Sequence, residues 1–92
     1  MSLSVRSAGL IRALIYPVQF DPRPLDGVDR VIDTVVKPGS LGATPEEYRA
    51  GIHEALASAD RLSSLIPQDH SEDVIRQYLA EVARRIEAAS LQ

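Results

Sequence analysis

The chain of 92 residues contains no cysteine and no tryptophan. The absence of thiols excludes disulfides, cysteine nucleophiles and thiolate metal sites. Aromatic residues are limited to three tyrosines and one phenylalanine. Because large aromatic side chains are so few, we expect a core built of leucine, isoleucine, valine and alanine. Such a core is thin for a chain of this length, which makes self-association a reasonable source of additional burial.

The chain also lacks an excess of positive charge and lacks long apolar runs. Ten basic residues against thirteen acidic ones give a net charge of −3, which does not suit a protein that neutralises phosphates, so we predict no nucleic-acid partner. The segment "LIRALIY" (Leu10–Tyr16) is interrupted by Arg12 and is too short for the apolar region of a signal peptide. No stretch reaches the roughly 18 apolar residues of a membrane helix. We therefore expect a cytoplasmic protein without a membrane partner.

Helical periodicity dominates what is present. Apolar residues recur at intervals of three and four in four stretches, separated by proline and glycine. The predicted helices are Ser4–Tyr16, Gly27–Val36, a helix that starts at Pro45, and Glu72–Ala89. The sequence thus predicts a single domain over residues 1–92, all-α, a small bundle of about four helices with Pro-rich connecting loops.

Local signals predict where these helices begin and end. Thr44, Pro45 and Glu47 have the spacing of an N-cap, an N1 proline and the acid of a capping box. Pro17 should end the first helix because it disfavours the α conformation of the residue before it, and Asp26 is a natural N-cap for the second. The third helix either runs on to residue 66 or breaks near residue 59, where serines and an aspartate weaken it.

The segment "PQDHSED" (Pro67–Asp73) combines three acids with one of only two histidines. Asp69, His70 and Asp73 are candidate metal ligands, with His53 as a more distant fourth candidate. The start of a helix explains the segment as well. Asp69 or Ser71 would cap the last helix, and acids in its first turn interact favourably with the positive end of the helix dipole. Because a metal needs three or more converging ligands, we prefer the structural interpretation and predict no metal and no cofactor.

No catalytic pattern accompanies these residues. The sequence has no G-x-S-x-G, no G-x-G-x-x-G and no P-loop, and "HE" at His53–Glu54 lacks the second histidine of a zinc motif. The predicted position of His53, one residue beyond an apolar stripe, indicates a half-exposed helix residue. We therefore predict that the protein is not an enzyme and has no catalytic residues.

Two regions are candidates for contact with a protein partner. The loop Pro17–Gly27 contains three prolines, which stiffen it and lower the entropic cost of binding through Phe20, Arg23 and Leu25. The alternative is that Phe20 and Leu25 fold inward, and we favour burial of Phe20. The second region is the last helix, whose wide apolar stripe includes Tyr78 and Leu79. We predict that this stripe forms a homodimer, the competing possibility being that the second helix and the proline-rich loop cover it within one chain.

Three short motifs follow one another in the chain: "FDP" at Phe20–Pro22, "PEEYRAGI" at Pro45–Ile52 and "IRQYLAEV" at Ile75–Val82. Their order resembles a family of small helical bacterial proteins of unknown function, which have Trp-Asp-Pro, then Asp-Glu-Tyr opening a helix, then Tyr-Leu on a terminal helix. This chain differs by Phe20 in place of tryptophan, by Glu46 in place of aspartate and by a longer insertion between the first two motifs. The resemblance implies a small α-helical bundle and nothing about activity.

Two classes of function fit these features. The first is a non-enzymatic protein–protein interaction module, for example an inhibitor or an immunity-type protein whose acidic surface meets a basic partner. The alternative is a small-ligand or metal-binding domain that uses His53, His70 and the adjacent acids. The distance between the two histidines distinguishes these two classes of function, because a shared site requires both imidazoles within about 5 Å of one another.

Overall fold

The computed structural model of the chain describes residues 3–19, 23–36, 44–59, 61–66, 68 and 70–90. These residues form the α-helices α1 (Val5–Ile15), α2 (Val28–Val36), α3 (Pro45–Ala57) and α4 (Glu72–Ser90). Short 3-10 turns lie between them: η1 (Tyr16–Val18), η2 (Pro24–Gly27) and η3 (Leu62–Ser64). The predicted all-α bundle is confirmed.

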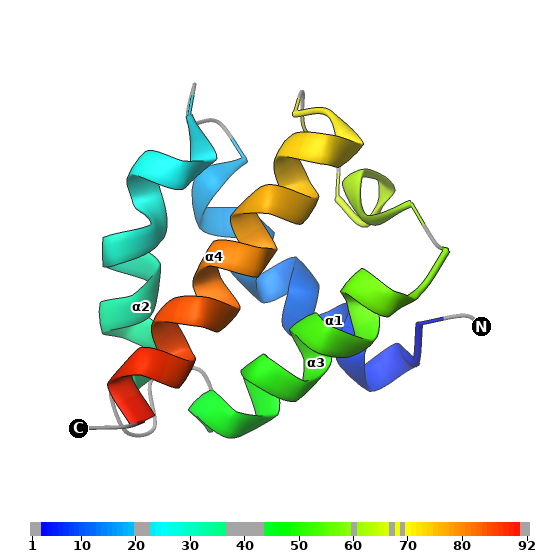
Figure 1. The fold of residues 1–92 in the computed structure, drawn as a ribbon. Coiled ribbons are helices and arrows are strands. Elements are labelled where there is room, and N and C mark those ends of the chain that lie inside the picture. Colours follow the sequence, from blue (N-terminus) through cyan, green and yellow to red (C-terminus); the bar gives the residue numbers. More distant parts are fainter. Residues whose placement is uncertain are drawn as a thin grey trace.

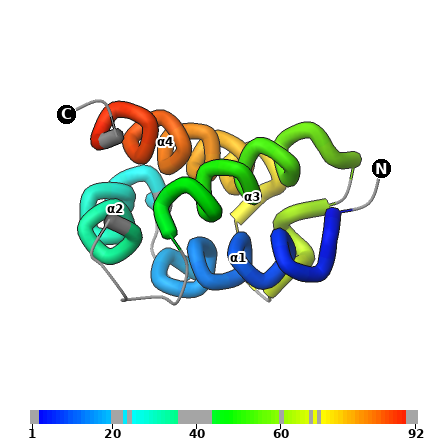
Figure 2. The backbone as a smooth tube through the Cα atoms, turned by 90° about the horizontal axis from the view of Figure 1, so that it is seen from below, coloured from blue at the N-terminus to red at the C-terminus, as the bar shows by residue number. Residues whose placement is uncertain are grey.

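In Figure 1, α3 and α4 lie next to each other and diverge from the C-terminal end of α4, and α1 passes behind them. Figure 2 shows α1 and α4 on opposite sides of the molecule with α3 between them, and α2 packed beside α4 at the end where the chain terminates. The hydroxyl of Tyr78 on α4 reaches across the bundle and donates a 2.6 Å hydrogen bond to the carbonyl of Leu14 on α1. The helices therefore share one core.

That core contains the apolar stripe of α4. Tyr78 and Leu79 are completely buried, and so are the stripe's other principal members Ile75, Val82 and Ile86. Side chains of α1, α2 and α3 cover them within the same chain. The prediction that Tyr78 and Leu79 form an interaction surface is wrong, because a helix in the middle of a bundle needs a stripe wide enough to contact neighbours on several sides.

The third helix begins and ends near the predicted positions. Thr44 accepts a hydrogen bond from the Glu47 N–H at 3.1 Å, and the Glu47 carboxylate accepts the Thr44 N–H at 3.1 Å, which is the predicted capping box. The helix ends at Ala57, and Ser58 has extended backbone angles. The structure thus confirms the break before residue 59.

The predicted bounds of α1 and α2 agree with the structure to within one residue, but Pro17 and Asp26 act differently from the prediction. The α-helix α1 stops at Ile15, but Tyr16 keeps α-helical backbone angles and its N–H still bonds to Arg12, so Pro17 tightens the helix into a 3-10 turn instead of expelling the preceding residue. Asp26 lies inside η2 and does not cap α2, which begins at Val28 as a direct continuation of that turn. Within the described residues, no helix is both long and apolar enough to cross a membrane.

Candidate functional site

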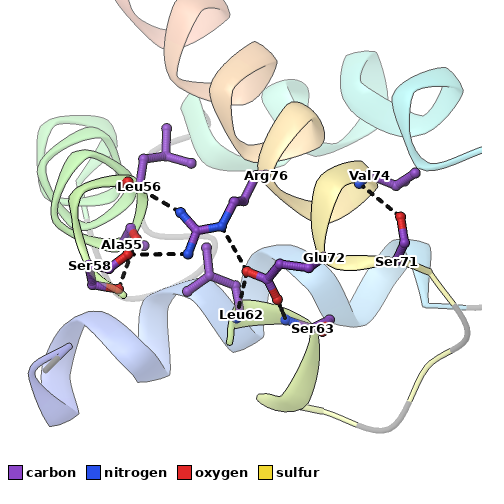
Figure 3. A network of polar contacts seen from close by, with 9 residues as sticks. All are labelled: Ala55, Leu56, Ser58, Leu62, Ser63, Ser71, Glu72, Val74 and Arg76. Atoms are coloured by element: carbon purple, nitrogen blue, oxygen red, sulfur yellow. Dashed lines mark hydrogen bonds and ion pairs between the residues drawn. The ribbon is translucent and has the colours of Figure 1, made fainter. Parts of the chain in front are cut away.

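A polar network at the junction between α3 and α4 is built around Arg76 (Figure 3). The Arg76 guanidinium donates to the carbonyls of Leu56 and Ser58, both at 3.2 Å, and to the Glu72 carboxylate at 2.8 Å. Leu56 and Ser58 belong to the end of α3, where backbone carbonyls have no partner within the helix. Arg76 therefore caps α3 from a neighbouring helix.

Glu72 binds backbone N–H groups of η3, just as Arg76 binds backbone carbonyls of α3. Its two carboxylate oxygens accept the backbone N–H groups of Leu62 and Ser63 at 3.0 and 2.9 Å. Burial works to raise the pKa of Glu72, but the hydrogen bonds from Ser63, Leu62 and Arg76 outweigh it and lower the pKa from 4.5 to about 2. The carboxylate is thus held in its charged form by the backbone that it organises.

Glu72 and Arg76 have the i, i+4 spacing that commonly forms ion pairs on the outer face of a helix. The pair exists, but the side chains are only 24% and 28% exposed because they face the end of α3. A second i, i+4 pair, Glu81 with Arg85, has side chains that are 25% and 41% exposed. The helical spacing of Glu72 and Arg76 indicates the pair correctly, whereas the contacts that bury it come from residues 9 to 20 positions away.

His70 is part of the same junction as a structural residue. Its Nε2 lies 3.0 Å from the carbonyl oxygen of Val18, and since a carbonyl only accepts, Nε2 carries the hydrogen. Ser71 caps α4 by accepting the N–H of Val74 at 3.2 Å, which selects Ser71 over Asp69 as the cap. Asp73 is exposed, and Asp69 lies outside the described residues. His70 thereby links the start of α4 to η1, the turn that follows α1.

The second histidine lies at the other end of α4. The Nε2 of His53 is 3.0 Å from the Glu87 carboxylate, which Arg49 also approaches at 3.6 Å. Fifteen residues separate Glu87 from Glu72, a rise of about 22 Å along a helix. His53 and His70 therefore do not converge, and the part of the chain that the structure describes holds no group of three residues able to bind a metal.

A shallow surface depression lies over the outer side of α4. Its volume is about 500 Å³, and its lining residues are Leu25, Gln77, Ala80, Glu81, Arg84 and Arg85. Arg85 joins the elements beneath it, since it bonds to Asp29 of α2 at 2.6 Å and to Glu81 of α4 at 3.1 Å. The pKa of Glu81 is lowered to about 2, mainly by its hydrogen bond to Arg84 and further by Arg85, against the opposing effect of burial. We call this depression, together with the exposed acids of η2 and α2, the α2/α4 surface.

The acids of the α2/α4 surface are Asp26, Asp29 and Asp33, all exposed. Their spacing of three and four residues places them along one side of the chain that leads from η2 into α2. The predicted contact residues Arg23 and Leu25 adjoin them in the sequence, and both are exposed, Leu25 to 45%. Phe20, the third predicted contact residue, lies outside the described residues. An exposed leucine is thus bordered by carboxylates and arginines.

Sequence reasoning missed several structural contacts. Glu54 on α3 accepts the Ser4 N–H at 2.9 Å and the Ser7 hydroxyl at 2.5 Å, and so supports the start of α1 from another helix. The pKa of Glu54 is lowered, first by the Ser7 hydroxyl and then by the Ser4 backbone. Ser4 was recognisable as an N-cap from its type and position, but no local pattern indicates a carboxylate 50 residues away.

The chain matches no protein-family model, and no curated protein or solved structure is significantly similar to it.

Proposed function

We propose that the protein is a non-enzymatic protein–protein interaction module that binds its partner through the α2/α4 surface. The observation that supports this most directly is Leu25, a large apolar side chain left 45% exposed among charged residues. It lies in η2, a turn that begins with Pro24 and packs against α4. Because this turn is ordered before binding, little conformational entropy is lost when a partner covers it.

The charge of the α2/α4 surface indicates the kind of partner. The exposed acids Asp26, Asp29 and Asp33, together with Glu81, outnumber the three arginines of this surface, and Arg85 is paired with both Asp29 and Glu81. The whole chain carries a net charge of −3. A basic protein domain fits this field, and attraction between opposite charges would speed its association. A cytoplasmic bacterial inhibitor or immunity-type protein that binds a basic toxin domain is one concrete form of this proposal.

The alternative, a small-ligand or metal-binding domain, required His53 and His70 to share a site. The two imidazoles are held at opposite ends of α4, by Glu87 and by the Val18 carbonyl. Each histidine has a structural partner in its own neighbourhood. The geometry therefore favours the interaction module.

We also propose that the protein forms a homodimer. The stripe on α4 that first indicated a dimer is buried inside one chain, so it cannot supply the contact. A dimer has to use a face that is exposed in the single chain. The α2/α4 surface is assigned above to a different, basic partner.

Site-specific photocrosslinking tests the interaction module. A photoreactive phenylalanine analogue is introduced at Leu25 and, as a matched exposed control, at Arg61, which lies on the η3 side of the molecule. In cells of the source organism, we expect position 25 to cross-link one discrete basic protein that position 61 does not capture. Equal labelling from both positions, or capture of no discrete protein at position 25, would contradict the proposal.

A further inference from the structure

A pocket lies between the end of α1, with the turn η1 that follows it, and α2. Its volume is about 150 Å³, and it is lined by Ala13, Leu14, Pro17, Arg30, Val31 and Thr34. Leu14 and Val31 belong to the buried core. The exposed lining residues are Pro17, Arg30 and Thr34. The pocket therefore has an apolar floor, and it opens to solvent at a rim that includes polar side chains.

Short side chains leave this space open. Ala13 and Pro17 lie four residues apart on one side of the pocket, and Arg30 and Thr34 lie four residues apart on the other, so each pair follows one face of its element. Alanine and threonine are too short to span the roughly 8–10 Å between the axes of packed helices. Since α1 packs mainly on α3 and α2 mainly on α4, the two helices do not close the space against each other. The pocket is thus preformed by the packing of the bundle.

The volume of the pocket limits the size of a ligand. An apolar protein cavity of about 150 Å³ accommodates a benzene molecule, whereas drug-sized ligands occupy pockets of roughly 300 Å³ or more. The pocket between α1 and α2 has about the former volume and a floor of leucine and valine. It therefore fits one six-membered ring.

Two groups at the rim specify the ring further. The hydroxyl of Thr34 donates to the carbonyl of Arg30 at 3.1 Å, so its oxygen serves a ligand as an acceptor. A ligand that bonds to this oxygen has to supply the hydrogen. The guanidinium of Arg30 is planar and stacks on aromatic rings even while its N–H groups bond elsewhere, which favours an aromatic ring over a saturated one.

We propose that this pocket binds a single aromatic ring that carries one hydroxyl or N–H donor, of which phenol is the simplest example. The ring lies over Leu14 and Val31 with Arg30 beside it, and its donor bonds to Thr34. Neither histidine lines the pocket, so the site differs from the ligand site that the histidines suggested. It is also separate from the α2/α4 surface, with which it shares no lining residue.

An NMR titration of the isotope-labelled protein with phenol tests the proposal. The amide signals of Leu14 and Val31 should shift along a saturating curve in the millimolar range, as expected for so small a ligand, whereas the signal of Arg61 on the η3 side should not move. Benzene lacks the donor and cyclohexanol lacks the aromatic ring, so both should bind several-fold more weakly than phenol. The absence of a saturating shift at Leu14 and Val31, or equal affinity for the three compounds, would overturn the inference.

Three variants locate the site. Ala13→Leu fills the pocket and should abolish phenol binding without lowering the melting temperature, whereas the same substitution at Ala80, exposed on α4, should leave phenol binding unchanged. Thr34→Val removes the acceptor at an exposed position, so it should reduce the affinity for phenol to that for benzene and leave benzene binding unaltered. Phenol binding that survives Ala13→Leu, or a preference for phenol that survives Thr34→Val, would contradict the proposal. Leu25 takes no part in these titrations, so their outcome is independent of the proposed interaction module.

Discussion

The Glu72–Arg76 junction allows a prediction whose magnitude follows from the structure. Replacing Glu72 by glutamine keeps the shape of the side chain but removes its charge, and the amide retains only one oxygen for the two N–H groups of Leu62 and Ser63. The pKa of Glu72 lies at about 2 instead of 4.5. At ~1.36 kcal/mol per pKa unit, this difference corresponds to about 3 kcal/mol of stability.

The pH dependence of this effect has a definite sign. A carboxyl group whose pKa is lowered by folding stabilises the native state fully above its unfolded pKa of 4.5, and loses that contribution as the pH falls toward about 2. Glu72→Gln should therefore be less stable than wild type by about 3 kcal/mol at pH 7. The difference should shrink steadily below pH 4.5 and nearly vanish at pH 2.

Urea denaturation followed by circular dichroism measures both quantities. With a dependence of about 1–1.5 kcal/mol per molar urea for a chain of this size, the midpoint at pH 7 should fall by roughly 2 M. Glu81→Gln is the matched control, because Glu81 has the same lowered pKa, but its carboxylate pairs with the arginines Arg84 and Arg85 of its own helix. It should lose less stability, and salt should reduce that loss. Equal losses for the two variants, or a Glu72→Gln loss that is constant from pH 7 to pH 2, would refute the role given to the junction.

Three further predictions follow from single features of the fold. Thr44→Ala should lower the free energy of unfolding by about 1 kcal/mol through loss of the capping box, and an unchanged urea midpoint would contradict that helix start. Gly9→Ala should raise it by about 0.5–1 kcal/mol, while Gly51→Ala should gain less because Leu10 has to move; the reverse order would contradict the packing of α1 on α3. Zn²⁺ should leave the melting temperature unchanged. If the native state had a zinc site, Zn²⁺ at a hundred times the dissociation constant would raise the free energy of unfolding by about 2.7 kcal/mol.

Local chemistry made part of the structure predictable. Thr44, Pro45 and Glu47 act within one turn of helix, so their sequence spacing was sufficient to locate the start of α3. The apolar periodicity of α4 identified the helix and its inner face correctly. The same periodicity could not show how many neighbours cover that face, which is why the stripe was assigned to a dimer. The width of an apolar stripe indicates how much of the helix surface is covered by other helices. It does not indicate whether those helices belong to the same chain or to a second copy.

The polar contacts that position the junction were beyond local reasoning. Arg76 bonds to carbonyls 18 and 20 residues before it, and His70 to a carbonyl 52 residues before it. These partners are backbone atoms, which carry no residue-type signal. The histidine-and-acid segment therefore suggested a metal site as readily as a helix start, and only the placement of His53 at the far end of α4 separated the two.

The most direct test of the proposed function is a calorimetric titration of the partner captured through Leu25. We expect Leu25→Ala to weaken binding about tenfold, the loss of roughly 1.4 kcal/mol typical of an interface anchor, and Tyr16→Ala to leave the affinity unchanged. We also expect the dissociation constant of the wild-type complex to rise with salt. Equal affinity for wild type and Leu25→Ala, or binding that is tightened by salt, would contradict the assignment of the α2/α4 surface to a basic protein partner.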